Sequence, residues 1–181
     1  ALDLIKNNDF TKKNIIIKKY NLDKKEPIIL FTLHPMSFSI SKTKKEINSS
    51  TEALKKIIKL FRSRCIITFP NSDAGSEYIL EKLHTLKNFS NKVTLHRSLG
   101  SSDYWGILDL VNYGFKVICV GNSSSGIKET TAFGCPTINI GDRQKGRLAG
   151  KNILHSHANP EEIFQKIKRC IKNNKFYDKF K

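Results

Sequence analysis

The chain has 181 residues, a length at which a single domain can bury one substantial core. Its formal net charge is +16, but lysine supplies most of the positive charge, and the lysine-rich stretches lack the arginine forks and interleaved aromatic rings that nucleic-acid binding uses, so we expect no nucleic-acid partner. No apolar run is long enough to cross a bilayer and the first residues lack a signal-peptide pattern, so we expect a cytoplasmic protein without a membrane partner.

Six short apolar runs, rich in β-branched residues, predict strands. They cover residues 27–33, 65–69, 92–95, 116–120, 136–140 and 152–154. Two amphipathic segments, 51–61 and 77–86, have apolar residues at helical spacing, and we interpret the chain as strands that are each followed by a helix. Strands that are apolar throughout are typical of a parallel sheet with helices on both faces. The predicted fold is therefore α/β, one domain with a doubly wound parallel sheet.

Four cysteines, Cys65, Cys119, Cys135 and Cys170, lie far apart, without a C-x-x-C pair or a histidine at metal-ligand spacing. A zinc site is therefore not expected, and we predict no metal or other cofactor. Cys65 and Cys119 begin or lie within apolar runs, which predicts buried, reduced thiols.

The loops that follow the strands are the expected location of a ligand site. Doubly wound sheets bind ligands outside the carboxyl ends of their strands. Four such loops are unusually polar or glycine-rich, namely residues 32–35, 69–76, 121–126 and 141–147.

The loop at 120–126 reads Val-Gly-Asn-Ser-Ser-Ser-Gly between a predicted strand and a predicted helix. Its backbone N–H groups and three hydroxyls would converge at the positive end of the helix dipole, which predicts an anion site. The alternative is that Asn122 or a serine only caps the helix. Glu129, a few residues further on, is either a surface carboxylate or an acceptor for two ribose hydroxyls.

His34 follows the first predicted strand and precedes Pro35, so we expect its side chain to point into the same cleft. An isolated histidine is usually structural, but an imidazolium at this position can neutralise a phosphate or donate a proton near neutral pH. Arg143 occupies the loop after the fifth strand, where a guanidinium can bind phosphate oxygens through two N–H groups. Asn71 and Asp73 follow the second strand, and either of them would also suit an Asx turn.

Four segments resemble, in order and spacing, the C-terminal domain of hydrolysing UDP-N-acetylglucosamine 2-epimerases. They are Thr-Leu-His-Pro at 32–35, Phe-Pro-Asn-Ser-Asp-Ala-Gly-Ser at 69–76, the glycine–serine segment at 121–129, and residues 133–147. The last segment is the most specific, because the non-hydrolysing epimerases carry a Thr-Thr-Glu-Arg-Pro-Glu-like stretch where this chain has Arg-Gln-Lys-Gly-Arg. The resemblance covers nearly the whole chain.

The resemblance implies a glycosyltransferase-B-like architecture, in which two Rossmann-like domains face each other across a cleft and the second holds UDP. It implies that His34 contacts the UDP diphosphate and is needed for activity. The UDP-binding residues that it implies are Asn71 in the nucleotide pocket, Ser123 and Ser124 at the phosphates with Gly126 beside them, Glu129 at the ribose, Arg143, and Ser98 in the uracil loop with Leu99. Residues 101–115 depart from the family in length.

In that family, UDP is eliminated across C1 and C2 of the sugar to give a glucal, and water then adds to yield N-acetylmannosamine for sialic- or legionaminic-type acid synthesis. The carboxylates that move the C2 proton belong to the N-terminal domain. The chain opens at Ala1 in a segment that resembles the inter-domain linker and stops at Lys181 before the expected final helix, so both ends look cut. We therefore expect a single UDP-binding domain over residues 1–181 that binds UDP and UDP-N-acetylglucosamine without turnover.

The missing N-terminal half is then an expected partner, and a homo-oligomer of the full-length protein is left open. Two alternative functions are also left open. One is the donor-binding half of a UDP-sugar glycosyltransferase, against which the Asp-Arg-Gln-Lys-Gly-Arg stretch at 142–147 argues. The other is a nucleotide-sugar-binding module without catalysis, which an upstream Rossmann-like half in the parent gene would exclude.

Overall fold

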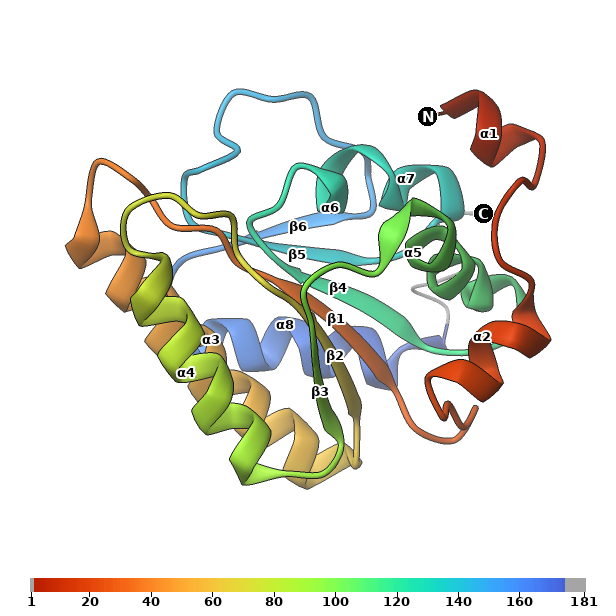
Figure 1. Ribbon diagram of the computed structural model, residues 1–181, viewed down its shortest axis with the longest axis horizontal. Coiled ribbons are helices and arrows are strands. Elements are labelled where there is room, and N and C mark those ends of the chain that lie inside the picture. The colour runs from red at the N-terminus through yellow and green to blue at the C-terminus, as the bar shows by residue number, and fades with distance from the viewer. Residues whose placement is uncertain (1, 175–181) are drawn as a thin grey trace.

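The computed structural model describes residues 2–174, which form a six-stranded parallel sheet with helices on both faces (Figure 1). The strands are β1 (Ile28–Thr32), β2 (Arg64–Thr68), β3 (Val93–His96), β4 (Val117–Gly121), β5 (Thr137–Ile140) and β6 (Ile153–Ser156). Their order in the sheet is β3-β2-β1-β4-β5-β6, with every neighbouring pair parallel. The predicted strands and the doubly wound α/β fold are confirmed, and the order reverses between β1 and β4.

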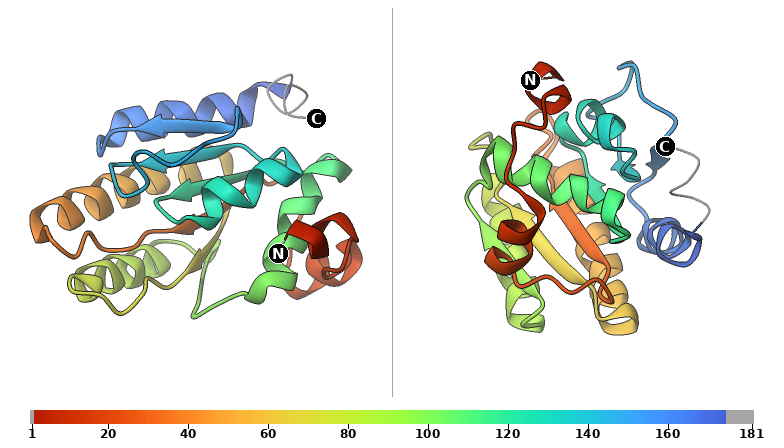
Figure 2. Two further views of the ribbon diagram at one scale, coloured as in Figure 1. Left: turned by 90° about the horizontal axis from the view of Figure 1, so that it is seen from above. Right: turned by 90° about the vertical axis from the view of Figure 1, so that its right-hand side faces the viewer.

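Both faces of the sheet are apolar, so helices cover both of them (Figure 2). On β1, Ile29 and Phe31 belong to one core cluster, and Ile28 and Leu30 belong to the other, because successive strand residues point to opposite faces. The first face is covered by α3 (Ile40–Phe61), α4 (Ser76–Phe89) and α8 (Pro160–Lys172). The second face is covered by α2 (Lys13–Lys19), α5 (Gly100–Asp109), the 3-10 helix η1 (Leu110–Tyr113) and α7 (Thr130–Phe133).

Helix α3 begins at Ile40, well before the predicted segment 51–61. The hydroxyl of Ser39 caps it by accepting the Lys42 N–H at 3.2 Å. Its first turns bury polar side chains, among them Thr43 and Glu46, so the apolar periodicity that marks the second half of the helix is absent from the first half.

The prediction that every strand is followed by a helix is wrong for β5. Residues 141–152 form a loop between β5 and β6 (Figure 1). Gly141 and Gly146 adopt φ values of 74° and 84°, in the left-handed region that glycine tolerates and that interrupts a helix. The loop therefore leaves the carboxyl end of the sheet without forming a helix.

The N-terminal segment contains α1 (Leu2–Lys6) and α2, and α2 packs against α5. Asp103 of α5 accepts hydrogen bonds from Thr11 at 2.7 Å, from Lys19 at 2.6 Å and from Tyr20 at 2.5 Å. These bonds fix residues 11–20 to the rest of the domain. Ala1 and residues 175–181, where the cut ends were expected, lie outside the described residues.

The four cysteines are all buried and free of disulfides within the described part of the chain, so the prediction for Cys65 and Cys119 is confirmed. Among residues 2–174, no helix combines the length and apolar character that a membrane span requires.

Candidate functional site

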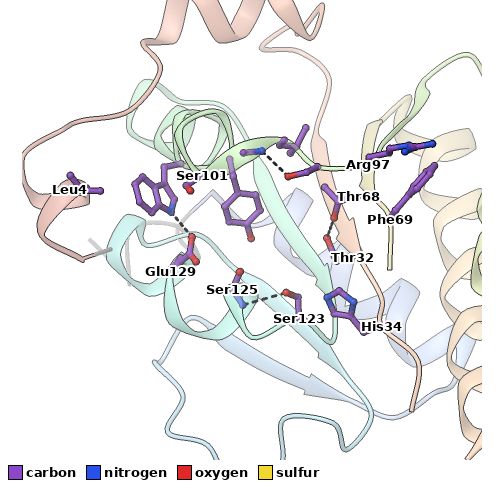
Figure 3. A pocket seen from close by; sticks show the side chains of 15 residues that line it. Leu4, Thr32, His34, Thr68, Phe69, Arg97, Ser101, Ser123, Ser125 and Glu129 are labelled. Atoms are coloured by element: carbon purple, nitrogen blue, oxygen red, sulfur yellow. Dashed lines mark hydrogen bonds between the residues drawn. The ribbon is translucent and has the colours of Figure 1, made fainter. Parts of the chain in front are cut away.

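A cavity of about 620 Å³ lies at the carboxyl ends of β1 to β4, where the strand order reverses (Figure 3). Its walls come from the ends of β1 and β2, residues 97–101, α5 and the loop around Ser123 and Ser125. This volume lies within the range of small-molecule sites. The cavity is where the sheet topology predicts a ligand.

Gly121 allows β4 to approach β1 closely at this point. A Cβ atom at position 121 would lie 1.9 Å from the carbonyl oxygen of Thr32, a distance that no side chain can take. The chain at Gly121 has a φ of 137°, which glycine alone adopts readily. The serine loop that follows is therefore held directly beside the end of β1.

The backbone of His34 is clamped by the side-chain amide of Asn122. The His34 N–H donates to Asn122 Oδ1 at 2.7 Å, and Asn122 Nδ2 donates to the His34 carbonyl at 2.9 Å. The Asn122 side chain is fully buried. These two bonds join the loop after β1 to the loop after β4, and they place His34 on the cavity wall (Figure 3).

The imidazole of His34 is held as well. Its Nδ1 accepts the backbone N–H of Asn71 at 3.0 Å, so that nitrogen carries no proton. Burial, followed by the nearby Arg143 charge, lowers the pKa of His34 below its usual value. The geometry therefore favours a neutral ring that donates from Nε2 over the imidazolium that the sequence pattern suggested.

The carbonyl of Asn122 ties in a third loop. It accepts hydrogen bonds from Arg143 Nη1 at 3.1 Å and from Gln144 Nε2 at 2.9 Å. Arg143 lies outside the set of described residues that line the cavity, although its charge acts on His34. Sequence reasoning considered Asn122 only as a helix cap and missed this role. The available sequence signal was that Asn122 directly follows Gly121, the glycine that comes after a predicted strand.

The serine loop contributes Ser123 and Ser125 to the cavity wall (Figure 3). The Ser125 N–H points toward Ser123 Oγ at 3.4 Å. Ser124 instead directly precedes α6 (Ser125–Lys128), and its carbonyl accepts the N–H groups of Ile127 and Lys128. Gly126, in this helix, is buried. The predicted helix is split into α6 and α7 by Glu129, so the hydroxyls and loop N–H groups, more than a long helix dipole, favour an anion here.

Glu129 is a cavity residue and not a free surface carboxylate. The indole N–H of Trp105, on α5, donates to Glu129 Oε2 (Figure 3). Trp105 is buried and is the single tryptophan of the sequence, but it lies in the segment at 101–115 whose length departs from the family. Sequence reasoning therefore missed it. The bond orients the carboxylate toward the cavity.

The remaining predicted residues have mixed placements. Ser98 and Leu99 line the cavity, and Ser98 Oγ accepts the Gly100 N–H at 3.1 Å. Asn71 closes an Asx turn, in which its Oδ1 accepts the Asp73 N–H at 3.2 Å, and it contributes to the site through the backbone N–H that holds His34. The structure thus brings His34, Ser98, Ser123 and Glu129 to one cavity.

Comparison with known proteins identifies the family. A family model described as UDP-N-acetylglucosamine 2-epimerase matches residues 2–181. The chain belongs to the UDP-N-acetylglucosamine 2-epimerase family. A GDP/UDP-N,N'-diacetylbacillosamine 2-epimerase (hydrolyzing) of Campylobacter jejuni is 36% identical over 170 residues, which are 92% of this chain and 42% of the relative.

Solved structures confirm the glycosyltransferase-B-like fold. The structure of S. aureus MnaA with UDP has a TM-score of 0.69 at 16% identity, over 98% of this chain and 44% of that one. A glycosyltransferase from Rickettsia africae has a TM-score of 0.64 at 20% identity, over 96% of this chain and 46% of that one. This epimerase-family chain therefore spans less than half the length of the relatives that it matches.

Proposed function

We propose that this chain is the UDP-binding part of a hydrolysing UDP-N-acetylglucosamine-type 2-epimerase. The observation that carries the proposal is one cavity that holds a neutral His34 after β1, the serine loop after β4 and Glu129, which Trp105 of α5 orients. Similarity to the hydrolysing C. jejuni epimerase supports the hydrolysing reaction, and similarity to the S. aureus protein solved with UDP supports UDP as ligand. The family match and the C. jejuni relative favour an epimerase over a glycosyltransferase.

Each part of UDP has a matching surface in the cavity. The uracil would lie against residues 97–101, and the Glu129 carboxylate would accept hydrogen bonds from the ribose hydroxyls. The diphosphate would bind the hydroxyls of Ser123 and Ser125 and the Nε2–H of His34. Arg143 would add positive charge close to the phosphates, since its charge already acts on His34.

The proposed reaction also requires groups that this cavity does not supply. Breaking the C2–H and C1–O bonds to release UDP needs a base for the C2 proton, and the later addition of water needs an acid. Glu129 is the single carboxylate among the described residues that line the cavity, and Trp105 already binds it. We infer that the acid–base groups belong to an N-terminal half, and that the product serves sialic- or legionaminic-type acid synthesis.

Calorimetry with UDP tests the proposal directly. We expect saturable UDP binding to the 181-residue chain, and a loss of about 1.5–3 kcal/mol in Ser123→Ala, because a hydrogen bond to a charged phosphate is lost. Ser41→Ala, at an exposed position on α3, is the matched control and should bind UDP as the unmodified chain does.

Two outcomes would overturn the proposal. The first is the absence of UDP binding at millimolar concentration. The second is release of N-acetylmannosamine from UDP-N-acetylglucosamine by the isolated chain, which would place the acid–base groups here and not in another half.

A further inference from the structure

A second cavity, of about 490 Å³, lies at the carboxyl ends of β5 and β6. Its walls come from the first turns of α3, from residues 139–147 and from residues 155–158. Among the described residues, the two cavities share no lining side chain. The helix that borders this cavity, α3, covers the opposite face of the sheet from α5, which borders the first cavity.

Three residues that line this cavity each hold a buried oxygen atom without a hydrogen-bond partner among the described residues. These atoms are Glu46 Oε2, Asn139 Oδ1 and Gln144 Oε1. The three residues are only 4%, 3% and 3% exposed. Because an unsatisfied buried polar atom costs about 1–3 kcal/mol, three such atoms on residues that line one cavity point to a ligand that supplies hydrogen-bonding groups.

The positions of these atoms are fixed by their neighbours. The amide of Gln144 is oriented by the bond from its Nε2 to the Asn122 carbonyl, so its Oε1 is an acceptor. The Asn139 amide contacts His155 Nδ1 at 3.1 Å, which leaves one polar atom of the amide unpaired in either orientation. The Glu46 carboxyl packs against the backbone of Gly141, where a Cβ atom would lie 1.8 Å from Glu46 Oε1.

The rim of the same cavity is positively charged. Lys42, Lys45, Lys145 and Arg147 lie on it, against one rim carboxylate, Asp142, among the described residues. Lys42 pairs with Asp142 at 3.6 Å, which leaves the other three cations for a ligand. A ligand that fits both the buried interior and the charged rim of this cavity presents hydrogen-bonding groups to the interior and a negative group to the rim.

We propose that this cavity is a binding site for a small phosphorylated sugar or polyol. Its hydroxyl groups, which can both donate and accept, would bond to Gln144 Oε1 and to the unpaired atoms of Glu46 and Asn139. Its phosphate would lie between Lys45, Lys145 and Arg147. The volume is far larger than a few water molecules need, at about 30 Å³ each. A nucleotide sugar bound in the first cavity would place its negatively charged diphosphate in that cavity. We therefore assign the positive rim of the second cavity to a different anion. The proposal does not depend on the UDP site.

The test is a titration of the 181-residue chain with glucose 6-phosphate in the presence of saturating UDP. Saturable binding is expected. Lys45→Glu on the rim and Asn139→Leu in the interior should each weaken it about ten-fold, equivalent to roughly 1.4 kcal/mol. Lys59→Glu, which changes the same charge at an exposed position on α3, is the control and should leave the affinity within about two-fold. UDP affinity should be the same in all three variants.

Three results would overturn the proposal. Competition between glucose 6-phosphate and UDP would mean that the sugar phosphate enters only the first cavity. Equal affinity for inorganic phosphate and glucose 6-phosphate would mean that the rim attracts anions without contacts to the buried oxygens. The third is the lack of saturable binding. If Asn139→Leu does not fold, the affinity of Lys45→Glu for glucose 6-phosphate decides the question, because Lys45 is exposed. The UDP titration shows separately whether the first cavity is intact.

Discussion

The replacement Asn122→Ala tests the clamp on His34. It removes both side-chain hydrogen bonds to the His34 backbone, at 2.7 and 2.9 Å, and leaves that N–H and carbonyl without partners. Each unsatisfied buried group costs about 1–3 kcal/mol, and the loop is partly accessible to water, so we expect a loss of about 2–4 kcal/mol in the free energy of unfolding. The folded variant should also bind UDP more weakly, because the imidazole is no longer held at the cavity wall.

Urea unfolding and UDP calorimetry on the same preparations measure the two effects. Asn112→Ala is the control, because Asn112 is exposed and its amide makes a surface hydrogen bond to Asp109, at 2.8 Å. It should change stability by less than about 0.5 kcal/mol and leave UDP affinity unchanged. If Asn122→Ala is as stable as this control, the amide does not hold the loop; if it is destabilised but binds UDP normally, positioning of His34 is refuted.

Three further predictions concern ionisable groups. Glu129→Gln should weaken UDP by about 1.5–3 kcal/mol but leave pyrophosphate affinity unchanged, since the carboxylate is proposed to contact only ribose; equal losses in calorimetry contradict that role. Burial, followed by Asp142, raises the pKa of Glu46 from 4.5 to about 7, so the folded state holds the proton more tightly. Stability should therefore fall by up to about 3 kcal/mol as pH rises through this window, and urea unfolding of Glu46→Gln should show a flatter profile. His34→Ala should weaken UDP equally at about pH 7 and pH 8, because a neutral ring donates at both, whereas a loss confined to lower pH indicates an imidazolium.

The sheet could be predicted because its strands are buried on both faces. The run at residues 28–31 is apolar at four consecutive positions, and that pattern is visible without tertiary information. The cavity could be located for a related reason, since the loops at the carboxyl ends of parallel strands must lie together. Loop position singled out His34 and Glu129, motif resemblance suggested their roles, and both residues line the cavity.

The parts that escaped prediction depend on contacts between distant segments. The first half of α3 buries Thr43, Glu46 and Ser50, and these polar side chains give no apolar period. The role of Asn122 depends on a backbone 88 positions away in sequence, and that of Trp105 on a carboxylate 24 positions away. Local pattern shows that such residues are present, but the fold determines what they bind.

The bonds at Asn122 have a consequence for protein engineering. One residue joins the loops after β1, β4 and β5, through its amide to His34 and through its carbonyl to Arg143 and Gln144. If one of these loops were replaced alone by that of a relative, its backbone could follow a different course, and its hydrogen bonds to the other two loops would be lost. Chimeras that aim to change the ligand should therefore exchange the three loops as a set, whereas residues 97–101, on the far side of the cavity, can be exchanged separately.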